Sequence, residues 1–161
     1  MYEECQAGII LLEKKLKIIT PKHLLQFVGW IDKYVENWAV CDSFCLKIIS
    51  KYYESYTSTL SDLYSRADSS NRWRRRAACV TLSKLTRTGR YYKEAFKLTE
   101  LLLEDKDIIV LKGVGWLLKE ASRCRTEEVI KFLNRNKSGI PQVVKSYAKE
   151  KMTSAQKARV L

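Results

Sequence analysis

The chain has 161 residues, and its 30 Lys and Arg outnumber its 18 Asp and Glu, which gives a formal net charge of +12. This length fits one domain with a substantial core, and only two Pro and six Gly argue against a disordered or turn-rich chain. No apolar run approaches the roughly 18 residues that a membrane-spanning helix needs, and no signal peptide is recognisable. The positive excess favours an anionic partner, most simply nucleic acid.

Apolar residues recur with helical spacing along the whole chain, so the sequence predicts helices joined by short turns. In chain order they are expected at about 3–19, 21–35, 37–51, 57–66, 72–86, 91–103, 107–122, 126–134 and 141–151, with a short helical piece after Ser154. Helix N-caps are expected at Thr20, within the break Asp68-Ser69-Ser70-Asn71, at Thr126 and at Ser154.

Two glycines, Gly113 and Gly115, fall inside the helix expected over 107–122. Each costs roughly 1 kcal/mol relative to Ala in a helix interior, so we expect another backbone to approach closely there. Helix pairs recur at about 35–45 residues, a period typical of HEAT-type repeats. We therefore expect a single all-α domain over 1–161, a right-handed solenoid of antiparallel helix pairs with a concave basic groove.

Three tryptophans mark successive repeats of this pattern. Trp38, Trp73 and Trp116 each stand on the first helix of an expected pair, and equivalent helices of a solenoid line the same surface. Trp38 and Asp42 are spaced i and i+4, so they share one face of a helix. The Arg72–Arg76 run occupies a helix's first turn, where cations oppose the helix dipole, and this conflict favours phosphate contact.

The cysteines and the single histidine do not predict a metal site. Cys5, Cys41, Cys45, Cys79 and Cys124 contain no C-x-x-C pair, and the one histidine, His23, is distant from them in the sequence. We therefore expect reduced thiols, no bound metal and no small-molecule cofactor. His23 follows Pro21 at the start of a helix, which favours a surface or capping role.

Taken in order, three motifs resemble the AlkD family of HEAT-like-repeat DNA glycosylases, which excise alkylated bases. They are W-x-x-x-D at 38–42, W-R-R-R-A-A at 73–78 and K-G-V-G-W-L-L-K-E at 112–120. Segments similar to the family run across essentially the whole chain. Family members carry further helix pairs before the point that corresponds to Met1, so the first helix is expected to lack a cover. Ala39 departs from the family, in which a second Asp often stands at this position.

The resemblance implies roles for individual residues. Asp42 matches the catalytic carboxylate, Trp38 the aromatic residue that packs against the lesion's sugar, and Trp116 the second aromatic wall. Arg76 is the favoured match to an arginine that contacts the DNA backbone, with Arg75 next. The remaining residues expected to bind DNA are Arg72, Arg74, Trp73, Lys112 and Lys119.

The leading hypothesis is a monofunctional DNA glycosylase that hydrolyses N3- or N7-alkylated purines in duplex DNA. It acts without a metal or cofactor, in the cytoplasm at the nucleoid, or in the nucleus of a eukaryote. The alternatives are a relative that binds distorted DNA without excision and, less favoured, a protein–protein scaffold. A monomer is expected, with self-association through the uncovered first helix as the other possibility.

Overall fold

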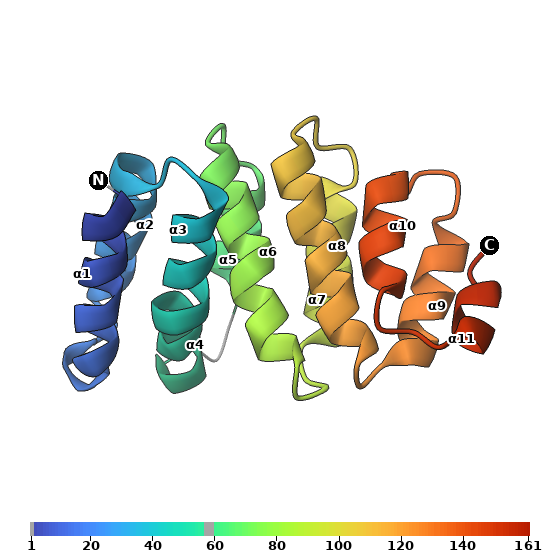
Figure 1. Ribbon diagram of the computed structural model, residues 1–161, viewed down its shortest axis with the longest axis horizontal. Helices are drawn as coiled ribbons and strands as arrows, with labels where there is room; N and C mark the ends of the chain where they lie inside the picture. Colours follow the sequence, from blue (N-terminus) through green and yellow to red (C-terminus); the bar gives the residue numbers. More distant parts are fainter. Residues whose placement is uncertain (1, 57–59) are drawn as a thin grey trace.

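The computed structural model describes residues 2–56 and 60–161, and every regular element in these ranges is a helix (Figure 1). The described helices are α1 (Tyr2–Lys14), α2 (His23–Tyr34), α3 (Trp38–Phe44), α4 (Ser50–Tyr56), α5 (Ser61–Ala67), α6 (Arg72–Thr86), α7 (Tyr92–Leu102), α8 (Ile108–Ser122), α9 (Thr126–Arg135), α10 (Gln142–Lys149) and α11 (Ser154–Ala158). The all-α class predicted from the sequence is confirmed. None of the described helices is both long and apolar enough to cross a membrane.

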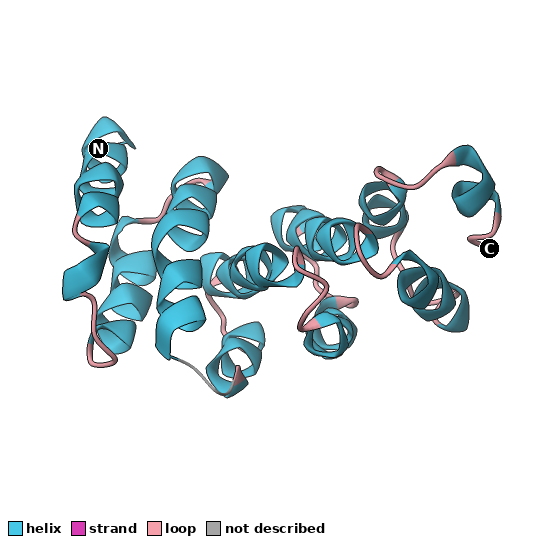
Figure 2. Ribbon diagram, turned by 90° about the horizontal axis from the view of Figure 1, so that it is seen from below, coloured by secondary structure: helices cyan, strands magenta, loops and turns pink. Residues whose placement is uncertain are grey.

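The helices stack in two layers along the molecule. One layer contains α1, α3, α6, α8 and α10, and the other contains α2, α5, α7 and α9 (Figures 1 and 2). In Figure 2 the row bends so that the layer with α6 and α8 lies on its inner side. The closest packing joins α6 to α8 and α8 to α10. This stacking of helix pairs confirms the predicted solenoid, and it places Trp38, Trp73 and Trp116 on helices of one layer.

Side-chain caps fix the starts of the three helices that carry the sequence motifs. Asn37 accepts a hydrogen bond from the backbone N–H of Val40 at the start of α3 (3.0 Å). Asn71 caps α6 through the N–H of Trp73 (2.8 Å), and Asp107 caps α8 through the N–H of Ile109 (2.9 Å). Each cap satisfies a donor that the helix itself leaves unpaired. The cap predicted within the break at 68–71 is confirmed, and the residue that forms it is Asn71.

Three other predicted caps, at Thr20, Thr126 and Ser154, are wrong. Helix α2 begins only at His23, whose ring accepts the backbone N–H of Thr20 (2.9 Å), so the histidine does have a capping role. Thr126 is the first residue of α9 and donates its hydroxyl to the Ser122 carbonyl (2.6 Å). Before α11 the cap is Thr153, not Ser154, because Thr153 forms a reciprocal capping box with the third residue of the helix.

The helix predicted over 37–51 runs on to Tyr56, because a π-helical segment at Cys45–Ile49 joins α3 to α4 without a break. The Ser50 hydroxyl donates to the Leu46 carbonyl within this segment (2.8 Å). Tyr56 at the end of α4 donates to the carbonyl of Ile19 (2.6 Å), which ties α4 to the turn before α2. Of the next helix, predicted over 57–66, residues 57–59 lie outside the described residues and the described part begins at Ser61.

Gly115 allows α10 to approach α8 closely. A Cβ atom at this position would lie 2.6 Å from the Cβ of Tyr147 and 3.3 Å from the backbone Cα of Val144. Both contacts are shorter than ordinary van der Waals distances, so only glycine fits without displacement of α10. The close approach predicted at this glycine is confirmed.

Candidate active site

Asp42 lies on the second turn of α3 and is almost completely buried, with 7% of its surface exposed. Arg76 of α6 binds both oxygens of its carboxylate. The Arg76 Nε donates to Oδ1 at 2.9 Å and Nη2 donates to Oδ2 at 2.7 Å. This bidentate geometry is the strongest form of an arginine–carboxylate contact, and it fixes the orientation of the Asp42 side chain.

Arg76 also connects this pair to α8. Its third nitrogen, Nη1, donates to the backbone carbonyl of Ile109 at 2.6 Å. Gly113, one turn further along α8, faces the same guanidinium: a Cβ there would lie 3.6 Å from the Arg76 Cγ and 3.7 Å from Nη1. Helices α3, α6 and α8 therefore meet at one arginine, and all three of its nitrogens are engaged.

The surroundings of the pair are apolar and affect its protonation. Burial raises the pKa of Asp42, and the hydrogen bonds and charge of Arg76 act in the opposite direction. Burial also raises the pKa of the nearby Cys79 thiol to about 12. The hydrogen bond with Cys45 and burial raise the pKa of Cys41, so the Cys41 and Cys79 thiols stay neutral and are not nucleophiles at neutral pH. Among the described residues no three His, Cys, Asp or Glu side chains are arranged to hold a metal ion.

The tryptophans differ in their exposure. Trp38, in the first turn of α3, is 57% exposed and lies one turn before the buried Asp42. Trp73 is half-buried, and the guanidinium of Arg72 lies 5.1 Å from the centre of its ring. Trp116 is half-buried on α8, one turn beyond Gly113 and on the same helix as the contact to Arg76. Trp38 is therefore the tryptophan most accessible to a ligand.

Glu120 is a residue that sequence reasoning did not single out. It is 2% exposed, and one of its oxygens accepts the indole N–H of Trp116 at 3.1 Å. Its other oxygen binds Arg123 at 2.7 Å and Arg87 at 3.0 Å. The carboxylate thus holds the Trp116 indole in one orientation. The i, i+4 spacing of Trp116 and Glu120 is the signal that could have identified this pair.

Each arginine of the Arg72–Arg76 run is paired with an aspartate from another segment. Arg72 binds Asp107 (3.1 Å), and Arg75 binds Asp105 (2.6 Å). Arg74 binds Asp32 of α2 through two nitrogens. These aspartate partners were not predictable from local sequence patterns, because they lie 30 to 42 residues away from the arginines that they bind.

The two lysines expected to bind DNA lie on α8 in different environments. Lys119 forms an ion pair with Glu150 at 3.2 Å, and its ammonium lies 5.8 Å from the ring centre of Trp116. The Lys112 side chain forms no ion pair or hydrogen bond with the part of the chain that the structure describes. Lys112, on the turn before Trp116, is therefore a cation available to an external anion.

A comparison with curated proteins finds no match to this chain. A comparison with family models does: the model described as DNA alkylation repair enzyme matches residues 1–152. The match spans all three sequence motifs and the helices that meet at Arg76. This family match agrees with the resemblance of the three motifs to the AlkD family. The chain therefore belongs to the DNA alkylation repair enzyme family.

Proposed function

We propose that this protein is a DNA glycosylase that hydrolyses the N-glycosidic bond of purines alkylated at N3 or N7 in duplex DNA. The observation that carries the proposal is a buried carboxylate, Asp42, fixed by Arg76 one turn from the exposed ring of Trp38. Family membership supports DNA as the partner. Such an enzyme would act wherever the genome lies, in a nucleoid or a nucleus.

Hydrolysis of an alkylated purine nucleotide requires few catalytic groups beyond Asp42, Arg76 and Trp38. Alkylation at N3 or N7 gives the base a positive charge, so the base leaves readily when the bond between C1′ and the base nitrogen breaks and its electron pair passes to the nitrogen. The positive charge then develops on the deoxyribose. A preorganised carboxylate near that charge lowers the barrier, which is usually the largest single catalytic effect. Water adds to C1′ and loses a proton, and the products are a free base and an abasic site.

Arg76 leaves part of the carboxylate available for this role. A carboxylate offers about four lone-pair positions, and the bidentate arginine occupies two of them. The remaining two are available to the attacking water or to the charge on the sugar. Arg76 is thus proposed to position Asp42, in addition to the contact with the DNA backbone that the resemblance implies.

The tryptophan, lysine and arginine side chains are proposed to bind the DNA. An aromatic face attracts a cation with about 0.5–2 kcal/mol, and Trp38 is exposed enough to meet the cationic sugar or base. We propose Lys112 and the half-exposed Arg72 as the first phosphate contacts. We propose Arg74, Arg75, Trp73 and Lys119 as further contributors to the DNA-binding surface and Trp116 as the second aromatic wall.

A second candidate function is recognition of distorted DNA without excision. The observation that favours it is the burial of Asp42, since its contacts with Arg76 would equally suit a salt bridge that only joins α3 to α6. The two candidates differ in one product, the free base.

The test uses a duplex with a single 7-methylguanine. The glycosylase proposal predicts free 7-methylguanine and a strand that stays intact until alkali cleaves it at the abasic site. Binding that weakens steeply with salt, without any base release, would instead establish the second candidate. A chain that neither binds the duplex nor releases base would contradict both.

A further inference from the structure

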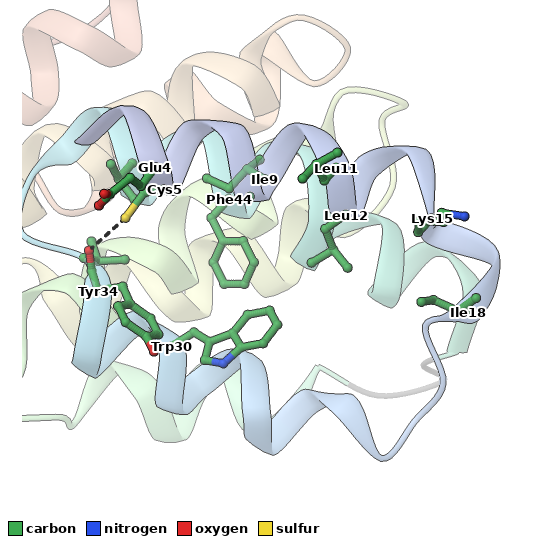
Figure 3. A pocket seen from close by; sticks show the side chains of 13 residues that line it. Glu4, Cys5, Ile9, Leu11, Leu12, Lys15, Ile18, Trp30, Tyr34 and Phe44 are labelled. Atoms are coloured by element: carbon green, nitrogen blue, oxygen red, sulfur yellow. Dashed lines mark hydrogen bonds between the residues drawn. The ribbon is translucent and has the colours of Figure 1, made fainter. Parts of the chain in front are cut away.

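An apolar groove lies at the end of the solenoid between α1 and α2, and Val40 and Phe44 of α3, the helix that carries Asp42, also line it (Figure 3). Its volume is about 620 Å³. Figure 3 shows Leu12 of α1 and Trp30 of α2 on its two sides, with Phe44 of α3 between them. The groove is open, and its lining is almost entirely hydrocarbon and aromatic.

The same apolar character continues on the outer face of α1. Ile9 is the buried residue of this helix, whereas Leu11 is 64% exposed and Ile18, in the turn that follows, is 62% exposed. Glu4, Gly8 and Leu11 are spaced by three or four residues, so they form one stripe along α1, and Lys15 and Ile18, which follow the end of this helix, also line the groove. An apolar stripe of this kind marks an interaction surface when it faces solvent.

Gly8 is unexplained by the contacts of its own chain. A Cβ at Gly115 would collide with α10 and one at Gly113 would meet Arg76, but a Cβ at Gly8 would meet no atom within 4 Å. Glycine weakens a helix, so its presence at an exposed position of α1 calls for another reason. The open space at Gly8, which Gly29 of α2 shares, leaves room for close approach of a helix from outside the chain.

The charges of α1 indicate which helix fits. Its first turn carries Glu3 and Glu4, its last residue is Lys14, and Lys15 follows directly after it. A second copy of α1 placed antiparallel to the first brings the acidic end of each against the basic end of the other. The register that sets Glu4 of one copy opposite Lys15 of the other also sets Gly8 opposite Leu11. Each leucine then packs over a glycine of the other copy, and this contact occurs twice. The stripe is therefore complementary to itself under a two-fold rotation.

We propose that α1 and the groove beside it form the interface of a homodimer in which two copies of α1 pack antiparallel. Leu11 of each protomer fills the space over Gly8 of its partner, and the glutamate and lysine ends pair at both edges. Asp42 and Arg76 are not among the residues that line the groove, so the dimer can be tested independently of base release.

The first test is sedimentation equilibrium of the full chain and of Leu11→Glu. Burial of an unpaired carboxylate should weaken the dimer by at least about tenfold in Kd. The matched control is Leu101→Glu on α7, because Leu101 is also exposed, at 55%, but lies outside the groove. The control should dimerise like the parent. A parent that is monomeric at all concentrations, or a dimer that Leu11→Glu leaves intact, would overturn the proposal.

The second test exchanges the charges. The pair Glu3→Lys/Glu4→Lys and the pair Lys14→Glu/Lys15→Glu should each lose the dimer, because like charges then meet at both edges. An equimolar mixture of the two variants should recover it as a heterodimer, because basic ends of one variant then meet acidic ends of the other at both edges. Circular dichroism verifies that both variants stay helical. Failure of the mixture to associate would exclude the antiparallel arrangement.

Discussion

The Asp42 carboxylate is bound by two nitrogens of Arg76, and yet its pKa lies above the ordinary value, because burial outweighs the arginine. The two effects have different functional consequences. The arginine fixes the direction in which the carboxylate points, and the dry surroundings strengthen its interaction with any cation that reaches it. Both consequences suit a group that must stabilise a short-lived positive charge.

The raised pKa of Asp42 predicts the acidic limb of the activity profile. A raised pKa means that the carboxylate takes up its proton at a higher pH than an ordinary aspartate, whose pKa is about 4. Because the proposed reaction needs the ionised form, the enzyme-dependent rate should fall as the pH drops through this raised pKa. The measurement is single-turnover release of 7-methylguanine against pH, corrected for spontaneous loss. An acidic limb centred below pH 4, in a protein that remains folded, would contradict it.

Trp38 should contribute to activity and little to stability, because more than half of its surface is exposed. Loss of one cation–π contact of about 0.5–2 kcal/mol corresponds to a rate reduction of about 2- to 30-fold for Trp38→Ala. The thermal midpoint should change little. Trp116→Ala is the comparison, since it also removes a partner of the buried Glu120 and should lower the thermal midpoint as well. Equal stability losses in the two variants would argue that Trp38 is a packing residue.

The sequence could predict part of this site. The spacing of Trp38 and Asp42 predicts that they share a helix face, and the run of arginines indicates a local excess of positive charge. Neither pattern shows that Asp42 is buried and Trp38 exposed, because burial depends on how α6 packs against α3. The aspartate partners of the arginines were equally hidden, since they lie on other helices and loops.

At the scale of the helices, boundaries were predictable where a local signal sets them. The ranges of α6 and α8 follow from Asn71 and Asp107, whose side chains bind the first turns. The continuous helix from α3 to α4 was not predictable in this way. The π-helical segment at Cys45–Ile49 shifts the spacing at which apolar residues recur along the helix. In the sequence such a shift resembles the end of a helix.

Gly115 provides a test of the packing between α8 and α10. In Gly115→Ala the added methyl group would lie 2.6 Å from the Cβ of Tyr147, so α10 must move. We expect a net loss of about 1–3 kcal/mol in the free energy of unfolding, as for other overpacked cores. Gly29→Ala is the matched control, because a Cβ there meets nothing within 4 Å, and it should gain about 0.5–1 kcal/mol. Urea denaturation measures both. A stabilised Gly115→Ala would contradict the close approach.

At the scale of the whole molecule, the net charge of +12 is not concentrated where the sequence suggested. All four arginines of the Arg72–Arg76 run are paired with an aspartate from another segment. The run therefore joins neighbouring segments as well as adding positive charge. Unpaired lysines such as Lys112 then carry more of the attraction for phosphate. This distribution predicts which substitutions change the salt dependence of binding.

Lys112→Ala should lower the slope of log Kobs against log salt concentration by about 1, because one phosphate contact is lost. Lys93→Ala is the control: Lys93 is exposed on α7 in the outer layer, and its removal should leave the slope unchanged. Fluorescence anisotropy with an undamaged duplex at several salt concentrations measures both slopes. Equal changes in the two variants would indicate that DNA is attracted by overall charge and not by the inner layer of helices.

The central claim is that the Asp42 carboxylate performs the chemistry. The most direct measurement is single-turnover release of 7-methylguanine by the parent, by Asp42→Asn and by Asp32→Asn, which alters a paired aspartate away from the site. The account predicts that Asp42→Asn loses release by about 100-fold or more while it still binds the duplex, and that Asp32→Asn retains release. Undiminished release by a folded Asp42→Asn would contradict the account.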